Sequence, residues 1–110
     1  MKLNFLKNKK ILVTGGTGSI GSSLVLALIK SPCKVVRVMS NDENGLYELA
    51  RDINSKFVIN YNLFTNQMEK QKIRFFLGDV RDVKRCHEIT NDVDIVIHAA
   101  AIKHVNISEY

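Results

Sequence analysis

Short apolar runs alternate along the chain with longer stretches in which apolar residues recur at helical spacing. The apolar runs predict strands at residues 11–13, 35–39, 73–77 and 95–97. The longer stretches predict helices at residues 19–30, 46–53 and 83–90. Ile20 and Val83 count toward the apolar faces of the first and third helices, and Ser31-Pro32 ends the first helix because proline cannot continue its hydrogen-bond ladder. For residues 56–71 the pattern allows three structures: an extension of the second helix, a short extra helix or an ordered loop.

The order of these elements, β-α-β-α-β-α-β, predicts a parallel sheet. Successive strands joined by helical crossovers run in the same direction. Strands covered on both faces read as continuous apolar runs without strict alternation, as these do. We therefore expect an α/β fold with a doubly wound sheet and helices on both of its faces.

Composition bounds the size of the molecule and its partners. With 110 residues, 45% of them hydrophobic and 25% charged, the chain has material for one small globular domain. The net charge of +5 is typical either of a basic solvated surface or of attraction to an anionic partner. Such a partner is a phosphate-bearing ligand, a nucleic acid or a membrane surface.

We expect neither a membrane span nor export. The longest apolar run, Leu24 to Ile29, is far shorter than the ~20 residues of a spanning helix. The apolar stretch after the N-terminal lysines is also too short for a secretory signal. Cys33 and Cys86 form neither a CxxC motif nor a disulfide framework, so a reducing compartment suits them and we expect a cytoplasmic protein.

A glycine-rich segment, TGGTGSIG, separates the first predicted strand from the first predicted helix. It matches both GxGxxG and TGxxGxxG. In such a loop the first glycine permits a tight turn, Gly18 lets a pyrophosphate approach the backbone, and Gly21 lets the helix pack closely. The N–H groups and positive dipole end of the helix then face the phosphates. This predicts a dinucleotide site, and a loop that serves packing alone is the alternative. The predicted cofactor-binding residues here are Thr14, Gly15, Gly16, Thr17, Gly18, Ser19, Ile20 and Gly21.

The end of the second predicted strand bears on the choice between NAD and NADP. NAD-binding proteins place an acidic residue there, where it binds the ribose 2′-OH. Here the strand ends at Ser40-Asn41, and Asp42 and Glu43 come one step later. A hydroxyl and an amide can bind a 2′-phosphate without charge repulsion, so we expect NADP rather than NAD. In the alternative interpretation, Asp42 and Glu43 only cap the second helix.

Two further strand ends carry candidate binding residues. Gly78-Asp79-Val80 follows the third strand, at the corner beside the adenine in this architecture. A carboxylate there can accept from the adenine amino group, and a backbone N–H can meet a ring nitrogen; a turn in which Asp79 caps a helix is the alternative. After the fourth strand, small residues allow the cofactor ribose and nicotinamide to lie against the backbone, unless they serve helix–sheet packing. These residues follow His98 and are Ala99, Ala100 and Ala101.

Other chemistries have little support in the sequence. The three histidines and two cysteines lack metal-ligand spacing, so we expect no metal site. The sequence lacks the GxSxG motif that would indicate a serine hydrolase. Nucleic-acid binding would rest on net charge alone, without a dense basic helix or an aromatic platform, and we do not expect it.

Three segments together resemble a known family: TGGTGSIG at 14–21, FFLGDVRD at 75–82 and HAAAIKHV at 98–105. They look like the extended short-chain dehydrogenase/reductases. HAAAIKHV, the segment SNDEN at 40–44 and the terminal Glu109-Tyr110 narrow the resemblance to the polysaccharide-biosynthesis branch, with its UDP-N-acetylglucosamine 4,6-dehydratases and nucleotide-sugar epimerases. The resemblance implies a Rossmann-type sheet of order 3-2-1-4, truncated after strand four. Residues 1–110 would then be the N-terminal NAD(P)-binding portion of a larger enzyme, without its substrate domain.

The resemblance also implies roles for individual residues. Gly15 through Gly21 would hold the pyrophosphate, and Asp79 and Val80 would contact adenine. Ala99 would line the cofactor. Lys103 would reach the cofactor or the sugar nucleotide, unless it is a solvated lysine that opens a helix. The residues that would surround the adenosine ribose and its 2′-phosphate are Ser40, Asn41, Asp42, Glu43, Asn44 and Gly45.

The chemistry of this family needs residues that the sequence does not contain. The resemblance implies that hydride leaves C4 of the sugar for NADP⁺, that water is eliminated across C5–C6, and that hydride returns to C6. A Tyr-x-x-x-Lys pair supplies the acid–base work in the superfamily. At that spacing Tyr47 is followed by Arg51 and Tyr61 by Thr65, and Tyr110 is the last residue. We therefore name no catalytic residue and expect the chain alone to be inactive.

These observations favour the cofactor portion of an NADP-dependent nucleotide-sugar 4,6-dehydratase. The alternatives are a 4-epimerase of the same superfamily and a noncatalytic dinucleotide-binding module. For an enzyme, the resemblance implies a UDP-sugar substrate and a homo-oligomer at full length. By itself the chain is expected to be marginally stable and to self-associate, because no fifth strand would pair with the outer edge of strand four.

Overall fold

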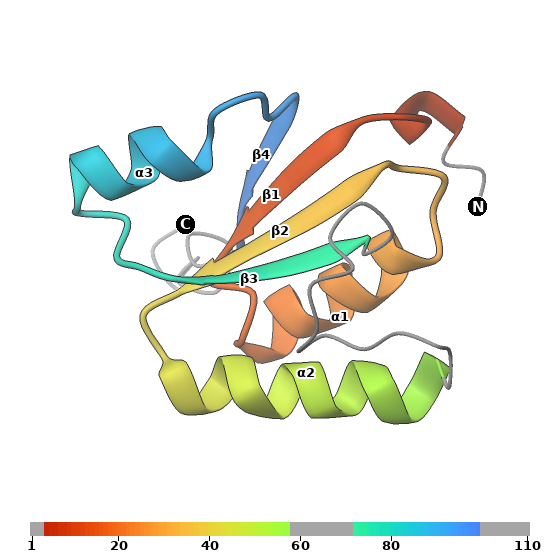
Figure 1. Ribbon diagram of the computed structural model, residues 1–110. Helices are drawn as coiled ribbons and strands as arrows, with labels where there is room; N and C mark the ends of the chain where they lie inside the picture. The colour runs from red at the N-terminus through yellow and green to blue at the C-terminus, as the bar shows by residue number, and fades with distance from the viewer. Residues whose placement is uncertain (1–3, 58–71, 100–110) are drawn as a thin grey trace, which may run out of the picture.

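Figure 1 shows the computed structural model, which describes residues 4–57 and 72–99. The four predicted strands are present as β1 (Lys10–Thr14), β2 (Val35–Ser40), β3 (Ile73–Leu77) and β4 (Ile95–His98). The predicted helices are α1 (Ser19–Ile29), α2 (Glu43–Phe57) and α3 (Val83–Ile89), and a 3-10 turn, η1 (Asn4–Leu6), precedes β1. Residues 56 and 57 therefore continue the second helix, and residues 58–71 lie outside the described part of the chain.

The strands form a parallel sheet in the predicted order, β3-β2-β1-β4. In register, Val13 of β1 lies opposite Val38 of β2 on one side and Ile97 of β4 on the other. The helices α1 and α2 lie against one face of the sheet, and α3 crosses the opposite face (Figure 1). The expected doubly wound, Rossmann-like fold is confirmed. Because the strands are parallel, their carboxyl ends lie along one edge of the sheet, where such folds bind ligands.

The larger hydrophobic core lies between the sheet and the layer of α1 and α2. Ile11 and Val13 of β1 face this core, whereas Leu12 between them faces α3. Full burial of one such aliphatic side chain favours folding by roughly 1.5–3 kcal/mol. The completely buried residues that join Ile11 and Val13 from other elements are Val25, Val36, Val38 and Ile53.

Two apolar residues predicted to face the core are exposed instead. Ile20 is 45% exposed, and the buried face of α1 is formed by Gly21, Val25 and Leu28. Val83 is 79% exposed, and Ile89 is the buried residue of α3. Both exposed residues lie in the first turn of a helix, at the edge of the sheet. Helical periodicity identified the buried face of α1 but could not show where along the helix the core begins, and for α3 it missed Ile89.

Arg37 of β2 holds the carboxyl end of α3 against the sheet. Its Nη1 donates to the carbonyl oxygens of Ile89 and Asn91, at 2.7 and 2.8 Å. The last carbonyls of a helix lack intrahelical partners and carry the negative end of its dipole. A guanidinium there donates to the free carbonyls and also places a positive charge at the negative end of the dipole. Asp92, with φ of 67°, then turns the chain toward β4.

Candidate functional site

The glycine segment leaves β1 at the carboxyl edge of the sheet and turns at once toward α1. Gly15 has φ of 70°, in the left-handed region that favours glycine. Its N–H donates to the Met39 carbonyl of β2 at 2.9 Å. The tight turn expected at the first glycine is therefore present, and it is tied to the neighbouring strand.

Two other glycines of the segment are required by packing. A Cβ on Gly16 would lie 2.5 Å from a methyl carbon of Val38. A Cβ on Gly21 would overlap the carbonyl of Gly15 and lie 2.8 Å from the Cα of Gly16. Gly21 thus lets α1 approach the glycine segment itself. The packing interpretation holds for Gly16 and Gly21.

Gly18 is the N-cap of α1, and its backbone does not require a glycine. Its φ of −73° and ψ of 172° are extended, a conformation that any residue adopts. The usual N-cap side chains would accept a hydrogen bond from the first turn, whereas Gly18 offers no such acceptor. The first-turn N–H groups of α1 are thereby left without a side-chain cap, which suits an incoming anion such as a pyrophosphate.

A chain of hydrogen bonds joins the glycine segment to the end of β2. The hydroxyl oxygens of Thr17 and Ser40 lie 3.0 Å apart, and Ser40 Oγ accepts from the Asp42 N–H at 3.0 Å. The Ser40 side chain is buried, so these protein partners hold it in place. Asn41, in contrast, is exposed. Of the two polar residues predicted to receive a 2′-phosphate, Asn41 is the more accessible.

Asp42 caps α2, as one interpretation of the sequence predicted. Its Oδ1 accepts from the Gly45 N–H at 3.0 Å, and its carbonyl accepts from the Leu46 N–H at 3.0 Å. Glu43 lies in the first turn, where an acidic side chain favours the helix dipole. A Cβ on Gly45 would lie 2.8 Å from Thr17 Cβ, so α2 begins directly against the glycine segment.

A small hollow brings three of the predicted segments together at the strand ends. It has a volume of about 110 Å³. Its walls come from the turn after β1, the end of β2 and the residues after β3. The Gly78 N–H donates to the Ser40 carbonyl at 2.9 Å, which joins the last two of these walls. The lining residues are Gly15, Met39, Ser40, Asn41, Gly78, Asp79 and Val80.

Asp79 lines this hollow and pairs with Arg81. Both carboxylate oxygens accept from the Arg81 guanidinium, and Oδ1 also accepts from the Arg81 backbone N–H at 2.8 Å. These hydrogen bonds, the side-chain ones first, lower the pKa of Asp79 to about 2. The N-cap of α3 is Asp82, whose Oδ1 accepts from the Arg85 N–H, so the alternative interpretation in which Asp79 caps this helix is wrong.

A hydrogen bond joins β1 to β4 at the same edge. Thr14 Oγ1 lies 2.7 Å from His98 Nδ1, and Thr14 is buried. His98 is the last residue of β4 rather than the first residue after it. Ala99 is 1% exposed and belongs to the larger core, as the packing interpretation predicted. The other candidates of this stretch, Ala100, Ala101 and Lys103, lie outside the described residues.

Sequence reasoning missed Arg81 and the contacts of Thr14 and Thr17. The only available signal for Arg81 was its place two positions after Asp79, a spacing at which a backbone N–H often bonds an aspartate side chain. The Thr14–His98 and Thr17–Ser40 contacts join residues 84 and 23 positions apart, and no local pattern indicates them.

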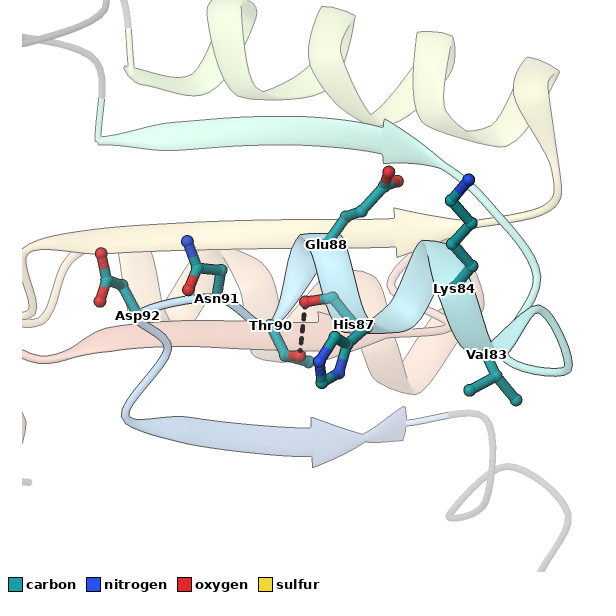
Figure 2. Close-up of a pocket in the computed structure, with 7 residues that line it drawn as sticks. All are labelled: Val83, Lys84, His87, Glu88, Thr90, Asn91 and Asp92. Atoms are coloured by element: carbon teal, nitrogen blue, oxygen red, sulfur yellow. Dashed lines mark hydrogen bonds between the residues drawn. The ribbon is translucent and has the colours of Figure 1, made fainter.

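An open groove of about 1130 Å³ lies elsewhere, along α3 and the turn that follows it (Figure 2). A hydrogen bond from Thr90 Oγ1 to the His87 carbonyl, at 3.3 Å, lies within this group. None of the residues predicted as a site residue belongs to the groove. Its lining residues are Val83, Lys84, His87, Glu88, Thr90, Asn91 and Asp92.

Three general features of the described residues complete the picture. In residues 4–57 and 72–99, no three His, Cys, Asp or Glu side chains are grouped so as to hold a metal ion. No helix in these ranges is long and apolar enough to cross a membrane. Cys33 and Cys86 are both free thiols.

Comparison with known proteins extends this description. Residues 11–110 match a family model described as "Polysaccharide biosynthesis protein". The chain is 46% identical over 107 residues to an uncharacterized membrane protein of Methanocaldococcus jannaschii. It is 40% identical over 104 residues to a UDP-N-acetylglucosamine 4,6-dehydratase (inverting) of Campylobacter jejuni, and 32% identical over 107 residues to a UDP-glucose 4-epimerase of Rickettsia felis.

These matches cover most of this chain but little of each relative. The three alignments include 97%, 93% and 94% of the chain, against 28%, 26% and 27% of the relatives. The chain thus spans about a quarter of the length of the curated relatives it matches. The X-ray structure of Pen from Bacillus thuringiensis superposes with a TM-score of 0.66 and 29% identity, over 84% of this chain and 24% of that one.

Proposed function

Because the chain belongs to the polysaccharide biosynthesis protein family, we propose that it is the dinucleotide-binding portion of an enzyme that acts on a nucleotide sugar. The specific proposal is an NADP-dependent 4,6-dehydratase. The observation that carries it is the convergence of the glycine segment, the end of β2 and the Asp79-Val80 corner on one hollow at the carboxyl edge of the sheet. Three chemically different parts of a dinucleotide would each find a suitable surface there.

The residues present fit the pyrophosphate. Gly18 places no side chain over the N-terminus of α1. The left-handed turn at Gly15 carries the chain directly from β1 to this helix start. The N–H groups of the first helical turn would donate to the phosphate oxygens, and the helix dipole would favour their charge. These residues would bind and orient the pyrophosphate, because the glycine segment contains no carboxylate, imidazole or amino group that could act as a general acid or base.

The end of β2 supports a preference for NADP over NAD. The Asp42 carboxylate accepts from the Gly45 N–H and so serves α2. The strand ends at Ser40 and is followed by Asn41, and both residues are neutral. An exposed amide at Asn41 would donate to a 2′-phosphate, while Ser40 stays held by Thr17 and Asp42.

The chemistry of the whole enzyme is part of the same proposal. A bound nicotinamide would accept a hydride from the sugar and return it. The described residues hold and orient the cofactor at the sheet edge, and Lys103, outside those residues, would contact the cofactor or the sugar. Cytoplasmic localisation and a homo-oligomeric whole enzyme remain parts of the proposal.

A 4-epimerase is the second candidate, because one relative, 32% identical, is a UDP-glucose 4-epimerase. The relative named as a dehydratase is 40% identical over a similar stretch, which favours dehydration. The products differ by one water. Mass spectrometry of UDP-N-acetylglucosamine incubated with the longest native form of the protein should show a product lighter by one water, whereas epimerisation leaves the mass unchanged.

Dinucleotide binding is tested separately from turnover. Calorimetric titration of the protein with NADPH and NADH should give the lower Kd for NADPH. Binding of NADPH without turnover by the longest native form would favour the noncatalytic module. If neither dinucleotide binds, the site assignment itself is wrong.

A further inference from the structure

We propose that Arg81 is a positioning residue for adenine recognition. It holds the Asp79 carboxylate so that one acceptor site remains for the 6-amino group of the base. The inference rests on the proposed dinucleotide site and names the residue that gives this site its preference for adenine.

The pairing between Arg81 and Asp79 uses three separate N–H donors. The backbone N–H of Arg81 donates to Oδ1 at 2.8 Å. Its Nη2 donates to Oδ2 at 2.8 Å, and its Nε lies 3.2 Å from both oxygens. The carboxylate is therefore held at both oxygens by a planar fork and by the backbone, which together define its orientation.

Counting donors against acceptor sites shows what the carboxylate can still bind. An ionised carboxylate offers about four lone-pair sites. Arg81 supplies three donors, because the shared Nε hydrogen counts once. About one site is left, and an exocyclic amino group has an N–H to fill it. Asp79 is thus prepared for a single donor in a single direction.

The placement of the two side chains indicates where that site lies. Asp79 is among the residues that line the hollow at the strand ends, and Arg81 is not. The Arg81 side chain is 86% exposed, against 30% for Asp79. The guanidinium therefore approaches the carboxylate from the solvent side, which leaves the side toward the hollow for a ligand.

The charge of Arg81 adds to the effect of its geometry. The pair is neutral as a whole, so a carboxylate can stand near the cofactor phosphates with little net repulsion. The same hydrogen bonds hold the pKa of Asp79 at about 2, so the group is an acceptor at every pH used for binding. A carboxylate freed from Arg81 would rotate and hydrate, and an amino group would have to displace that water.

The test compares two ligands that differ only at the 6-amino group. Calorimetry would give the Kd of NADPH and of its analogue with purine in place of adenine, for the wild type and for Arg81→Ala. For the wild type we expect the Kd of the purine analogue to be about ten times the Kd of NADPH, because the analogue loses one hydrogen bond to a charged acceptor. In Arg81→Ala we expect this ratio of the two Kd values to fall to about threefold or less. This variant keeps the backbone N–H, and exposed ion pairs contribute little to stability, so it should melt within a few degrees of the wild type.

Lys84→Ala is the matched control. It also removes one exposed cation near the start of α3, but Lys84 lines the separate groove along that helix. It should keep the tenfold ratio. A wild type that binds both ligands equally, or an Arg81→Ala protein that keeps the wild-type ratio, overturns this inference alone. A wild type that binds neither ligand overturns the proposed function as well.

Discussion

Thr17 and Ser40 share a hydrogen bond of 3.0 Å between their hydroxyls, although they lie 23 positions apart. Thr17 belongs to the segment proposed to hold the pyrophosphate, and Ser40 ends the strand proposed to hold the ribose. Ser40 also accepts from the Asp42 N–H at the start of α2. The surfaces for two parts of the dinucleotide are therefore fixed relative to one another before any ligand arrives, which reduces the ordering that binding requires.

Asn41→Asp should reverse the preference between the two dinucleotides. The new carboxylate would stand at an exposed strand end, where it repels a 2′-phosphate but can accept from a 2′-OH. We expect the Kd for NADPH to rise at least about tenfold and the Kd for NADH to stay within about threefold. Both would be measured by calorimetry. Asn91→Asp, far from the site, should change neither; an Asn41→Asp protein that still prefers NADPH would show that the 2′-phosphate lies elsewhere.

Gly18→Val should abolish dinucleotide binding without unfolding the protein. The extended backbone at this position accepts valine, but the branched side chain would occupy the space proposed for the pyrophosphate. Circular dichroism would check the fold, and titration with NADPH would check binding. Ser23→Val places the same side chain on the exposed surface of α1 and should bind normally. Retained affinity in folded Gly18→Val would place the phosphates elsewhere.

Gly21→Ala should damage stability rather than binding chemistry. The added methyl group meets the backbone of Gly15 and Gly16, which cannot move aside as a flexible side chain can. We expect a loss of about 1–3 kcal/mol in the free energy of unfolding, measured by urea denaturation. A Gly21→Ala protein as stable as the wild type would contradict the close packing of α1 on the glycine segment.

Acid should release the Asp79–Arg81 pair at unusually low pH. Since the pKa of Asp79 is lowered from 3.8 to about 2, the pair's contribution to folding is complete above about pH 4 and is lost as the pH falls toward 2. Titration of the Asp79 carboxyl carbon by NMR should show this midpoint. Arg81→Ala should raise it most of the way to 3.8, the retained backbone hydrogen bond keeping it slightly lower. A wild-type midpoint near 3.8 would mean that the pair does not form in solution.

The 110-residue chain should self-associate through the edge of β4. Within the described residues β4 pairs only with β1, and Val96 on it is 45% exposed. Charged residues on an edge strand oppose pairing with another chain. Light scattering should therefore show a mass that rises with concentration and falls toward the monomer in Val96→Lys. Tyr47→Lys on α2, a position that is 63% exposed on another element, should leave the association unchanged; a wild-type monomer at all concentrations would overturn the prediction.

The strands could be predicted because they follow from burial, whereas their order was implied by the resemblance to a Rossmann-type sheet. Most positions of β1 and β2 are apolar, with Arg37 and Ser40 as exceptions in β2, since helices cover both faces of the sheet. The alternation with helices requires parallel neighbours. The exposure of Ile20 could not be predicted in the same way, because periodicity shows the direction of a side chain but not whether the core extends beneath it.

Only the part of the candidate site that the glycine motif forms could be predicted from the sequence. TGGTGSIG correctly located a turn and a helix start. It could not distinguish the glycines that packing requires, Gly16 and Gly21, from Gly18. Gly18 has an ordinary extended backbone and provides no side-chain cap for α1. The role of Asp82 as the cap of α3 and the pairing of Asp79 with Arg81 depend on where β3 ends and α3 begins. Only the three-dimensional arrangement distinguishes two aspartates that lie so close together in the sequence.

The pairing of β1 with β4 has a consequence for how the chain is made. Thr14 and His98, which meet at the end of this pair, are separated by 84 positions. At a translation rate of about 5–20 residues per second, β4 leaves the ribosome roughly 4–17 s after β1. Pairings of such high contact order also fold slowly, because a long loop must close before they form. During that interval the central strand of the sheet has an open edge, and the nascent chain is most exposed to aggregation before β4 has left the ribosome.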